Sequence, residues 1–180
     1  MLHVTRIVLA GILLAGTTHA LQAQVAPPRQ QMFEAIIAEM LATEERNGTR
    51  IAPLDHEVVV DGASFDAMLA SLAVKQESAK TAELSILGRS VRVSTWERTA
   101  TCEISSGVRR CRVPAAVTVI RFFKAAWLKP GESLTIVVGA YHRAQYGKRA
   151  EGVGGSGWRL FLERRDGRWM VTKKQMTFQS

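Results

Sequence analysis

The 180-residue sequence predicts an α+β domain in which N-terminal helices pack on an antiparallel sheet of about five or six strands. Two observations predict this fold class. Apolar residues recur at helical spacing in two segments before residue 84, and they alternate with polar residues in several segments after it. The length and an apolar content of 47% suit one domain with a single core.

The first 20 residues have the pattern of a secretory signal peptide. Arg6 precedes an apolar run over residues 7–16, and residues 18–20 have the small-x-small ending of a cleavage site. The run is shorter than the roughly 20 residues of a membrane-spanning helix, and no later window approaches that length. We therefore expect a periplasmic or secreted protein with no transmembrane segment in its mature chain. An uncleaved tether is the alternative.

The domain boundaries follow from this signal. Cleavage is expected after Ala20 or Ala23, and residues 21–29 are predicted to be a linker that contains Pro27-Pro28. A single α+β domain is then expected over residues 30–178.

Two amphipathic helices are predicted, with a short strand at 57–60 between them. The first is expected to end at Asn47-Gly48, and the second to begin with Ser64 as its N-cap. Each helix carries one apolar stripe, which is typical of core packing. The stripes are Phe33, Ile36, Ile37, Met40 and Leu41, followed by Phe65, Met68, Leu69, Leu72 and Ala73.

From about residue 84 the apolar period changes from about 3.6 to about 2, which predicts strands. Asp166-Gly167 is expected to join the last two strands in a hairpin, and the strand that begins at Val113 is expected to continue from an earlier one. The predicted strands are 91–95, 113–119, 134–140, 158–164 and 169–178.

The only cysteines, Cys102 and Cys111, are predicted to form a disulfide, because an oxidising compartment favours that state for an even pair. Ser106-Gly107 suits a two-residue hairpin loop with Ser105 opposite Val108. The same register places the two cysteines opposite each other as a non-hydrogen-bonded pair, with Cα atoms about 4.5 Å apart. A metal would need more ligands than two thiols, so no metal site is predicted here.

The formal charge of +8 is unevenly distributed. Residues 21–88 hold 5 basic and 10 acidic side chains, whereas residues 89–180 hold 18 basic and 6 acidic ones. The second segment could attract phosphates, acidic polysaccharide or an anionic membrane surface, and export makes nucleic acid a poor partner. The alternative is a solvated outer face whose Lys and Arg side chains keep the sheet soluble and protect its edges.

The closing hairpin reads Arg164-Arg165-Asp166-Gly167-Arg168-Trp169 between two apolar strands, after the order helix, short strand, helix and long strands. This arrangement resembles the nuclear-transport-factor-two-like superfamily, which includes SnoaL-like and ketosteroid-isomerase-like proteins, over residues 30–178. The resemblance implies a curved sheet that wraps the helices into a cone whose mouth can hold a small apolar ligand. Members of the superfamily include isomerases, hydratases, dehydratases and domains with no chemistry, so the fold does not fix a function.

Members that transfer protons place an Asp or His base and a Tyr or Asp donor inside the cone. The candidates in this sequence are Asp55, His56, Asp61, Tyr141 and His142. His142 continues the apolar face of its strand in strict alternation, so it is expected to point into the cone unless it lies in water beyond the core edge. Asp55 and His56 lie beside a proline and a short strand, where turn bonding is the alternative.

The glycine-rich segment 152–157 matches a dinucleotide-binding pattern in spacing only. That fingerprint must open a helix, whereas the residues that follow favour a strand, so we predict a flexible connection and no cofactor. With Lys148-Arg149 nearby, a phosphate-binding loop is the alternative.

The sequence thus predicts an exported domain that binds a small apolar ligand or an envelope partner without chemistry of its own. One alternative is an isomerase or lyase that uses an acid or base in the sheet pocket. Another is a protein that docks on anionic envelope polymer through its basic C-terminal half. The sequence predicts no oligomeric state.

Overall fold

The computed structural model describes residues 28–43, 51–74, 83–146 and 150–179. The predicted signal peptide, most of the linker, the expected end of the first helix at Asn47-Gly48 and Lys148-Arg149 lie outside the described residues. No helix in the described ranges is long and apolar enough to cross a membrane.

The described residues form helices and strands in the predicted α+β order, with more strands than expected. The helices are α1 (Pro28–Ala42), α2 (Gly62–Ser71) and α3 (Trp96–Thr99). The strands are β1 (Glu57–Asp61), β2 (Glu83–Ile86), β3 (Arg89–Ser94), β4 (Thr101–Ser105), β5 (Val108–Arg112), β6 (Val117–Lys129), β7 (Ser133–Tyr146), β8 (Ala150–Arg165) and β9 (Arg168–Gln179).

Seven strands form the main sheet in the order β2-β3-β1-β6-β7-β8-β9, and β4 and β5 form a separate two-stranded ribbon. The main sheet is antiparallel except at β1, which pairs in parallel with both β3 and β6. The predicted antiparallel pairing is therefore confirmed for every strand except β1, whereas the predicted number of about five or six strands was too low. The side chains of β1 from Val58 to Asp61 are all buried, as expected for a parallel strand covered on both faces.

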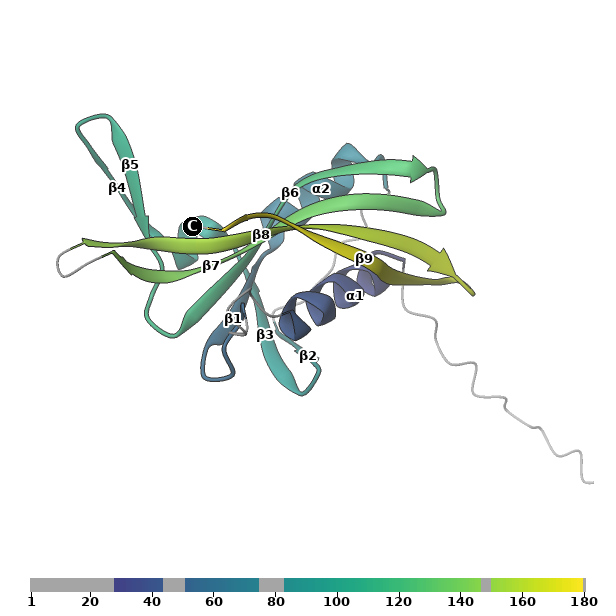
Figure 1. Ribbon diagram of the computed structural model, residues 1–180, viewed down its shortest axis with the longest axis horizontal. Coiled ribbons are helices and arrows are strands. Elements are labelled where there is room, and N and C mark those ends of the chain that lie inside the picture. The colour runs from purple at the N-terminus through teal and green to yellow at the C-terminus, as the bar shows by residue number, and fades with distance from the viewer. Residues whose placement is uncertain (1–27, 44–50, 75–82, 147–149, 180) are drawn as a thin grey trace, which may run out of the picture.

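The long strands β6 to β9 curl over the helices, with α1 against β9 and α2 against β6 (Figure 1). The pairing register shifts between β6 and β7 at Phe122/Lys124 and Trp127/Lys129, and between β8 and β9 at Gly157/Trp158 and Phe161/Leu162. Such bulges increase the local twist of a sheet. They are a physical reason for its curl.

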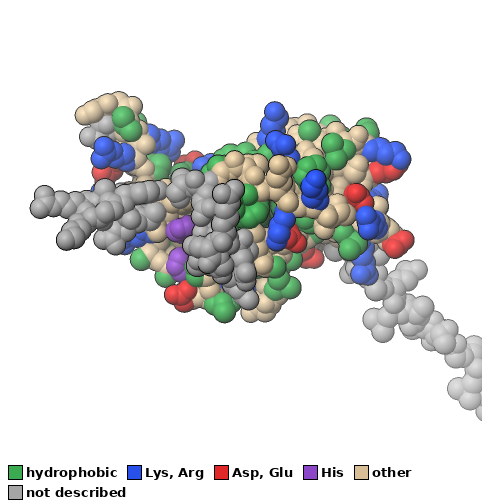
Figure 2. Space-filling view, in the orientation of Figure 1, with side chains coloured by type: hydrophobic (Ala, Val, Ile, Leu, Met, Phe, Trp, Pro, Cys, Tyr) green, Lys and Arg blue, Asp and Glu red, His purple; other side chains and the backbone are tan. Residues whose placement is uncertain are grey.

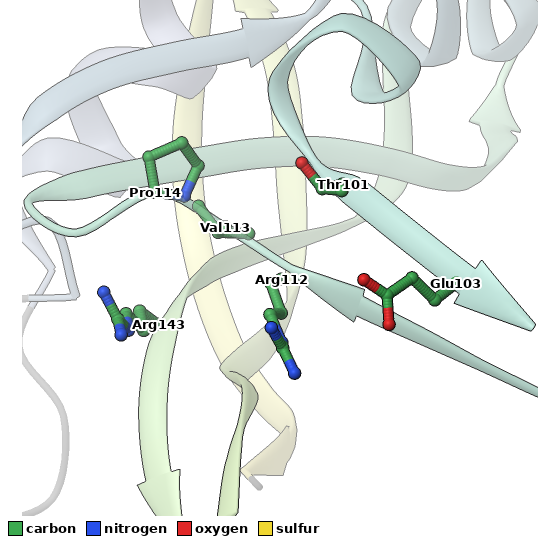
Figure 3. Close-up of a pocket in the computed structure, with 6 residues that line it drawn as sticks. All are labelled: Thr101, Glu103, Arg112, Val113, Pro114 and Arg143. Carbon is green, nitrogen blue, oxygen red and sulfur yellow. The ribbon is translucent and has the colours of Figure 1, made fainter. Parts of the chain in front are cut away.

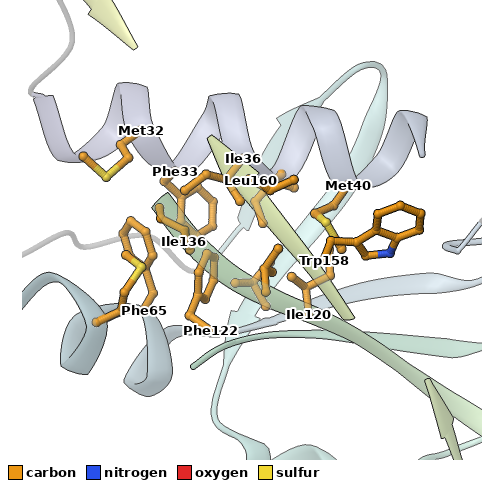
Figure 4. Packing of buried hydrophobic residues seen from close by; sticks show 14 of the residues in the cluster. Met32, Phe33, Ile36, Met40, Phe65, Ile120, Phe122, Ile136, Trp158 and Leu160 are labelled. Atoms are coloured by element: carbon orange, nitrogen blue, oxygen red, sulfur yellow. The ribbon is translucent and has the colours of Figure 1, made fainter. Parts of the chain in front are cut away.

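The face of the sheet under α1 and α2, called the inner face here, is filled by apolar side chains (Figure 4). Both predicted helical stripes are buried in it except Ala73, which is exposed beyond the end of α2, and Leu69 has no exposed surface. Three aromatic rings meet in the middle, with centroids 5.1 Å apart for Phe33 and Phe65 and 4.8 Å apart for Phe65 and Phe122. Helices α1 and α2 and the sheet thus share one apolar core.

The second helix begins earlier than predicted. Asp61, the last residue of β1, is the N-cap of α2, and its side chain accepts a hydrogen bond of 3.4 Å from the Ser64 backbone N–H. Ser64 is already inside the helix, where its hydroxyl donates to the Asp61 carbonyl at 2.7 Å and accepts from the Phe122 N–H at 3.0 Å. Ser64 therefore ties α2 to β6 and does not cap the helix.

The predicted hairpin register of the ribbon is confirmed, including Ser105 opposite Val108 and Cys102 opposite Cys111. The cysteines form a disulfide, with their Cα atoms 4.0 Å apart. The expected continuation into the next strand was wrong. After β5 the chain passes through Pro114, which lacks an N–H, and Ala116, whose φ is 53°, before β6 begins.

The glycine-rich segment is part of β8, so the prediction of a flexible connection was wrong. A Cβ on Gly155 would lie 2.7 Å from the Ala140 carbonyl oxygen and 2.8 Å from the Tyr141 ring. A Cβ on Gly157 would lie 2.0 Å from the Phe178 ring. A side chain at either position would collide with a neighbouring aromatic ring, so glycine is required there.

Candidate functional site

The predicted site residues of β7 lie on opposite faces of the main sheet. His142 is in register between Thr118 of β6 and Gly154 of β8, on the inner face with Ala140. Tyr141 packs instead against a smaller cluster on the other face, called the outer face here. The two candidates are therefore separated by the sheet, and they cannot act as a base and a donor on one ligand.

Polar side chains gather at one end of the inner face. The Nδ1 atom of His56 lies 3.0 Å from the Thr118 hydroxyl, and Thr118 is directly opposite His142 in the β6–β7 register. Thr118 and Ser156 are buried, whereas both histidines are half-buried. Figure 2 shows the described histidine side chains close together at the surface. We call this cluster the polar end; it consists of His56, Thr118, His142 and Ser156. Two of the predicted site residues, His56 and His142, belong to it.

A buried donor lies near this polar end. Trp158 follows Ser156 by two residues on the same face of β8, and its indole Nε1 is buried without a hydrogen-bond partner among the residues that the structure describes. A buried N–H that lacks an acceptor is uncommon in folded proteins. The inner face therefore holds polar groups that packing alone does not explain.

The turn that carries Asp55 and His56 is held by the side chain of Arg89. The guanidinium of Arg89 donates to three carbonyl oxygens, those of Ala52 and Pro53 at 2.7 Å and that of His56 at 2.9 Å. The Asp55 side chain is exposed to solvent. This clamp fixes His56 beside Thr118 and leaves Asp55 outside the polar end.

Asp61 is the last residue of β1, lies on the outer face of the sheet and is 2% exposed. Its carboxylate accepts a hydrogen bond of 2.9 Å from the Arg121 Nε, and the Arg121 guanidinium lies 4.5 Å from the centroid of the Trp96 ring. Because the carboxylate also caps α2, its acceptor capacity is used within the fold. Asp61 therefore has a structural role.

Tyr141 lies in an aromatic cluster on the outer face. Its ring centroid is 5.9 Å from that of Trp96, 6.1 Å from that of Phe123 and 6.4 Å from that of Phe178. Burial raises the pKa of the Tyr141 hydroxyl, and the positive charge of Arg121 partly offsets that rise. A phenol with a raised pKa stays neutral at physiological pH and can serve as a hydrogen-bond donor.

An open hollow of about 310 Å³ lies at the base of the ribbon, where β4 and β5 meet β7 (Figure 3). Two arginines, one glutamate, one threonine and two apolar residues line it. The lining residues are Thr101, Glu103, Arg112, Val113, Pro114 and Arg143. The hollow thus combines apolar and charged lining groups.

Two guanidinium groups make this hollow suitable for an anion, because a guanidinium binds a carboxylate or a phosphate through two parallel hydrogen bonds. Arg112 and Glu103 form no ion pair with any residue that the structure describes. The prediction of site residues did not include this hollow. The basic run that ends at Arg112 was the available signal, but the sequence did not show that β7 would bring Arg143 beside it.

Within the described ranges, no group of three or more His, Cys, Asp or Glu side chains is placed to hold a metal ion. No protein-family model, curated protein or solved structure matches this chain.

Proposed function

We propose that this chain is an exported, non-catalytic domain that binds an anionic envelope partner at the end of the molecule that carries the ribbon. The observation behind this proposal is the open hollow with Arg112 and Arg143 at the base of an exposed basic strand. Export is supported by the predicted signal peptide and by the Cys102–Cys111 disulfide, since disulfides persist in oxidising compartments.

The packing of the inner face supports binding over catalysis. A cone with a deep apolar cavity would favour an enzyme, whereas this one is occupied by the helical stripes and by the rings of Phe33, Phe65 and Phe122. A filled interior directs ligands to the outer surface. The hollow of about 310 Å³ is at the lower end of the size usual for small-molecule sites.

We also propose membership of the nuclear-transport-factor-two-like superfamily. The order helix, short strand, helix and long strands supports it, as does a sheet that curls over its helices (Figure 1). The Asp166-Gly167 turn of the closing hairpin, with both residues at positive φ, agrees with the residues that carry the resemblance.

The binding proposal is tested with a soluble polyanion. The oxidised protein should bind polyglutamate at low salt, and binding should weaken steeply toward physiological ionic strength, where exposed charges are screened over about 8 Å. Arg112→Glu should weaken binding, because it reverses the charge at the hollow. Arg168→Glu is the matched control, since Arg168 is an exposed arginine at the turn between β8 and β9.

Lys173 and Lys174 are poor choices for such a test. The Nζ of Lys174 forms an ion pair with Glu39 at 2.8 Å and a hydrogen bond with Thr43 at 3.1 Å, and the Nζ of Lys173 lies 5.4 Å from the Phe161 ring centroid. Replacing Lys174 would disturb the contact between α1 and β9, and replacing Lys173 would remove its contact with the Phe161 ring of β8. Equal binding by the parent and Arg112→Glu, or no polyanion binding at low salt, would refute the proposal.

A second candidate is an isomerase or lyase that uses a histidine at the polar end of the inner face. The specific observation that favours it is the contact of His56 with Thr118, which lies opposite His142, near the Trp158 N–H, which has no partner among the described residues. A thermal-shift screen of small apolar carbonyl compounds tests this candidate. A compound that raises the Tm of the parent but not that of His142→Ala would support it, provided that the unliganded variant melts as the parent does.

A further inference from the structure

The ribbon ends in apolar side chains that face solvent. Ile104 is 78% exposed and Val108 is 55% exposed, and both belong to the last two residue pairs before the Ser106-Gly107 turn. The ribbon projects from the body of the protein in Figure 1. Because folding leaves these two side chains exposed, they do not add to the hydrophobic core, and core packing does not explain their presence at the tip.

Arginines lie directly beside this apolar tip. Arg109 is opposite Ile104 in the ribbon register, and Arg110 is opposite Glu103. Neither arginine forms an ion pair with a residue in the described part of the chain, and both are exposed. Figure 2 shows basic and hydrophobic side chains together on the projecting ribbon.

The tip is also held rigid before any partner binds. The Cys102–Cys111 disulfide lies two residue pairs from Ile104, and the turn residues Ser106 and Gly107 have φ values of 52° and 76°. These positive values are those of a tight hairpin turn. Docking of such a tip requires little further ordering of the chain, which favours affinity.

We propose that the ribbon docks on the surface of a bilayer that contains anionic lipid. Ile104 and Val108 enter the interfacial region, and Arg109 and Arg110 bind lipid phosphates. This inference rests on the proposed function, since it names the anionic partner. A hydrated polymer would satisfy the arginines but would leave the apolar tip in water, whereas a bilayer surface accommodates both.

The test is co-sedimentation of the oxidised full chain with vesicles of phosphatidylglycerol and phosphatidylcholine, compared with vesicles of phosphatidylcholine alone. The parent should bind the anionic vesicles more tightly. Arg109→Gln should weaken that binding about fivefold. The double replacement Ile104→Ser with Val108→Ser should weaken it about tenfold or more, because both side chains lose their transfer to the interface.

Two control variants carry the same changes at other turns. Leu128→Ser removes an apolar side chain that is 61% exposed near the turn between β6 and β7, and Arg168→Gln removes an exposed arginine at the turn between β8 and β9. Both should bind within about twofold of the parent, since a change of solvent-exposed groups away from the interface has little effect on affinity.

The outcomes separate the two proposals. Binding to polyglutamate without binding to anionic vesicles overturns membrane docking and leaves the proposed function standing. Equal binding to both vesicle types, or a double variant that binds as the parent does, also overturns membrane docking. If the protein binds neither polyglutamate nor vesicles at low salt, both proposals are wrong.

Discussion

Side chains such as Leu134, Ile136 and Leu160 in the main sheet are fully buried under the helices, whereas every described side chain of the ribbon is exposed except the half-buried cysteines. The main sheet is therefore held by apolar burial and the ribbon by hairpin hydrogen bonds and one disulfide. Most residues of the ribbon can change without loss of core packing. Core packing therefore does not constrain the exposed arginines and the apolar tip of the ribbon, and these residues can serve binding instead.

The largest expected difference is in the response to truncation. Leu69→Ala should lower the free energy of unfolding by about 2–5 kcal/mol through lost transfer energy and a cavity. Ile104→Ala should change it by no more than about 0.5 kcal/mol, because Ile104 is 78% exposed. Urea melts of both variants beside the parent measure the contrast. A neutral Leu69→Ala would mean that α2 does not cover the sheet.

The second difference concerns the disulfide. Closing so short a loop contributes about 2–3 kcal/mol, and we expect this contribution to act locally. Replacing Cys102 and Cys111 by serine should reduce hydrogen-exchange protection in residues 101–112 while the main sheet keeps its protection. Exchange measured by mass spectrometry reports each segment. Equal loss of protection in the main sheet would show that the ribbon folds as part of the core.

The third test is on the outer face of the main sheet. Gly155→Ala should cost about 1–3 kcal/mol, because the new Cβ would meet the Ala140 carbonyl oxygen at 2.7 Å and that backbone cannot move freely. Gly139→Ala should cost less, since its nearest neighbours are the Tyr141 and Phe123 rings at 3.0 Å and 3.1 Å. Thermal melts rank the two. The opposite order would mean that the rings, and not the backbone, limit the space.

Local patterns in the sequence predicted much of this fold. The two helical stripes, the ribbon register through Cys102–Cys111 and the turn at Asp166-Gly167 each depend on residues close together in the chain. Periodicity and turn chemistry encode such features directly.

Features that depend on distant residues could not be predicted in this way. Gly155 and Gly157 of β8 have no room for a side chain because Tyr141 of β7 lies against the first and Phe178 of β9 against the second. The hollow needs Arg143 of β7 beside Arg112 of the ribbon. For the predicted site, alternation placed His142 on the inner face but did not show that Thr118 would bring His56 to it.

The smallest expected effect links the two regions. Tyr141 and the ribbon cysteines pack against the same outer-face cluster, so the ribbon helps to keep that cluster dry. Burial raises the pKa of Tyr141 above its ordinary value of about 10. Folding then favours the neutral phenol. The free energy of unfolding should not change below the pKa that Tyr141 has in the unfolded chain. It should decrease as the pH rises from that pKa through the raised pKa of Tyr141 in the folded protein.

An ultraviolet titration of the phenolate measures this pKa. Tyr141→Phe should remove a component that titrates above the ordinary tyrosine range, and Tyr146→Phe should retain it. In the variant with both cysteines replaced by serine, the same component should move toward its ordinary value, because a loosened ribbon admits water to the cluster. A Tyr141 component that titrates at or below about 10 in the parent would contradict a dry outer face. An unchanged component in the serine variant would show that the ribbon does not shield it.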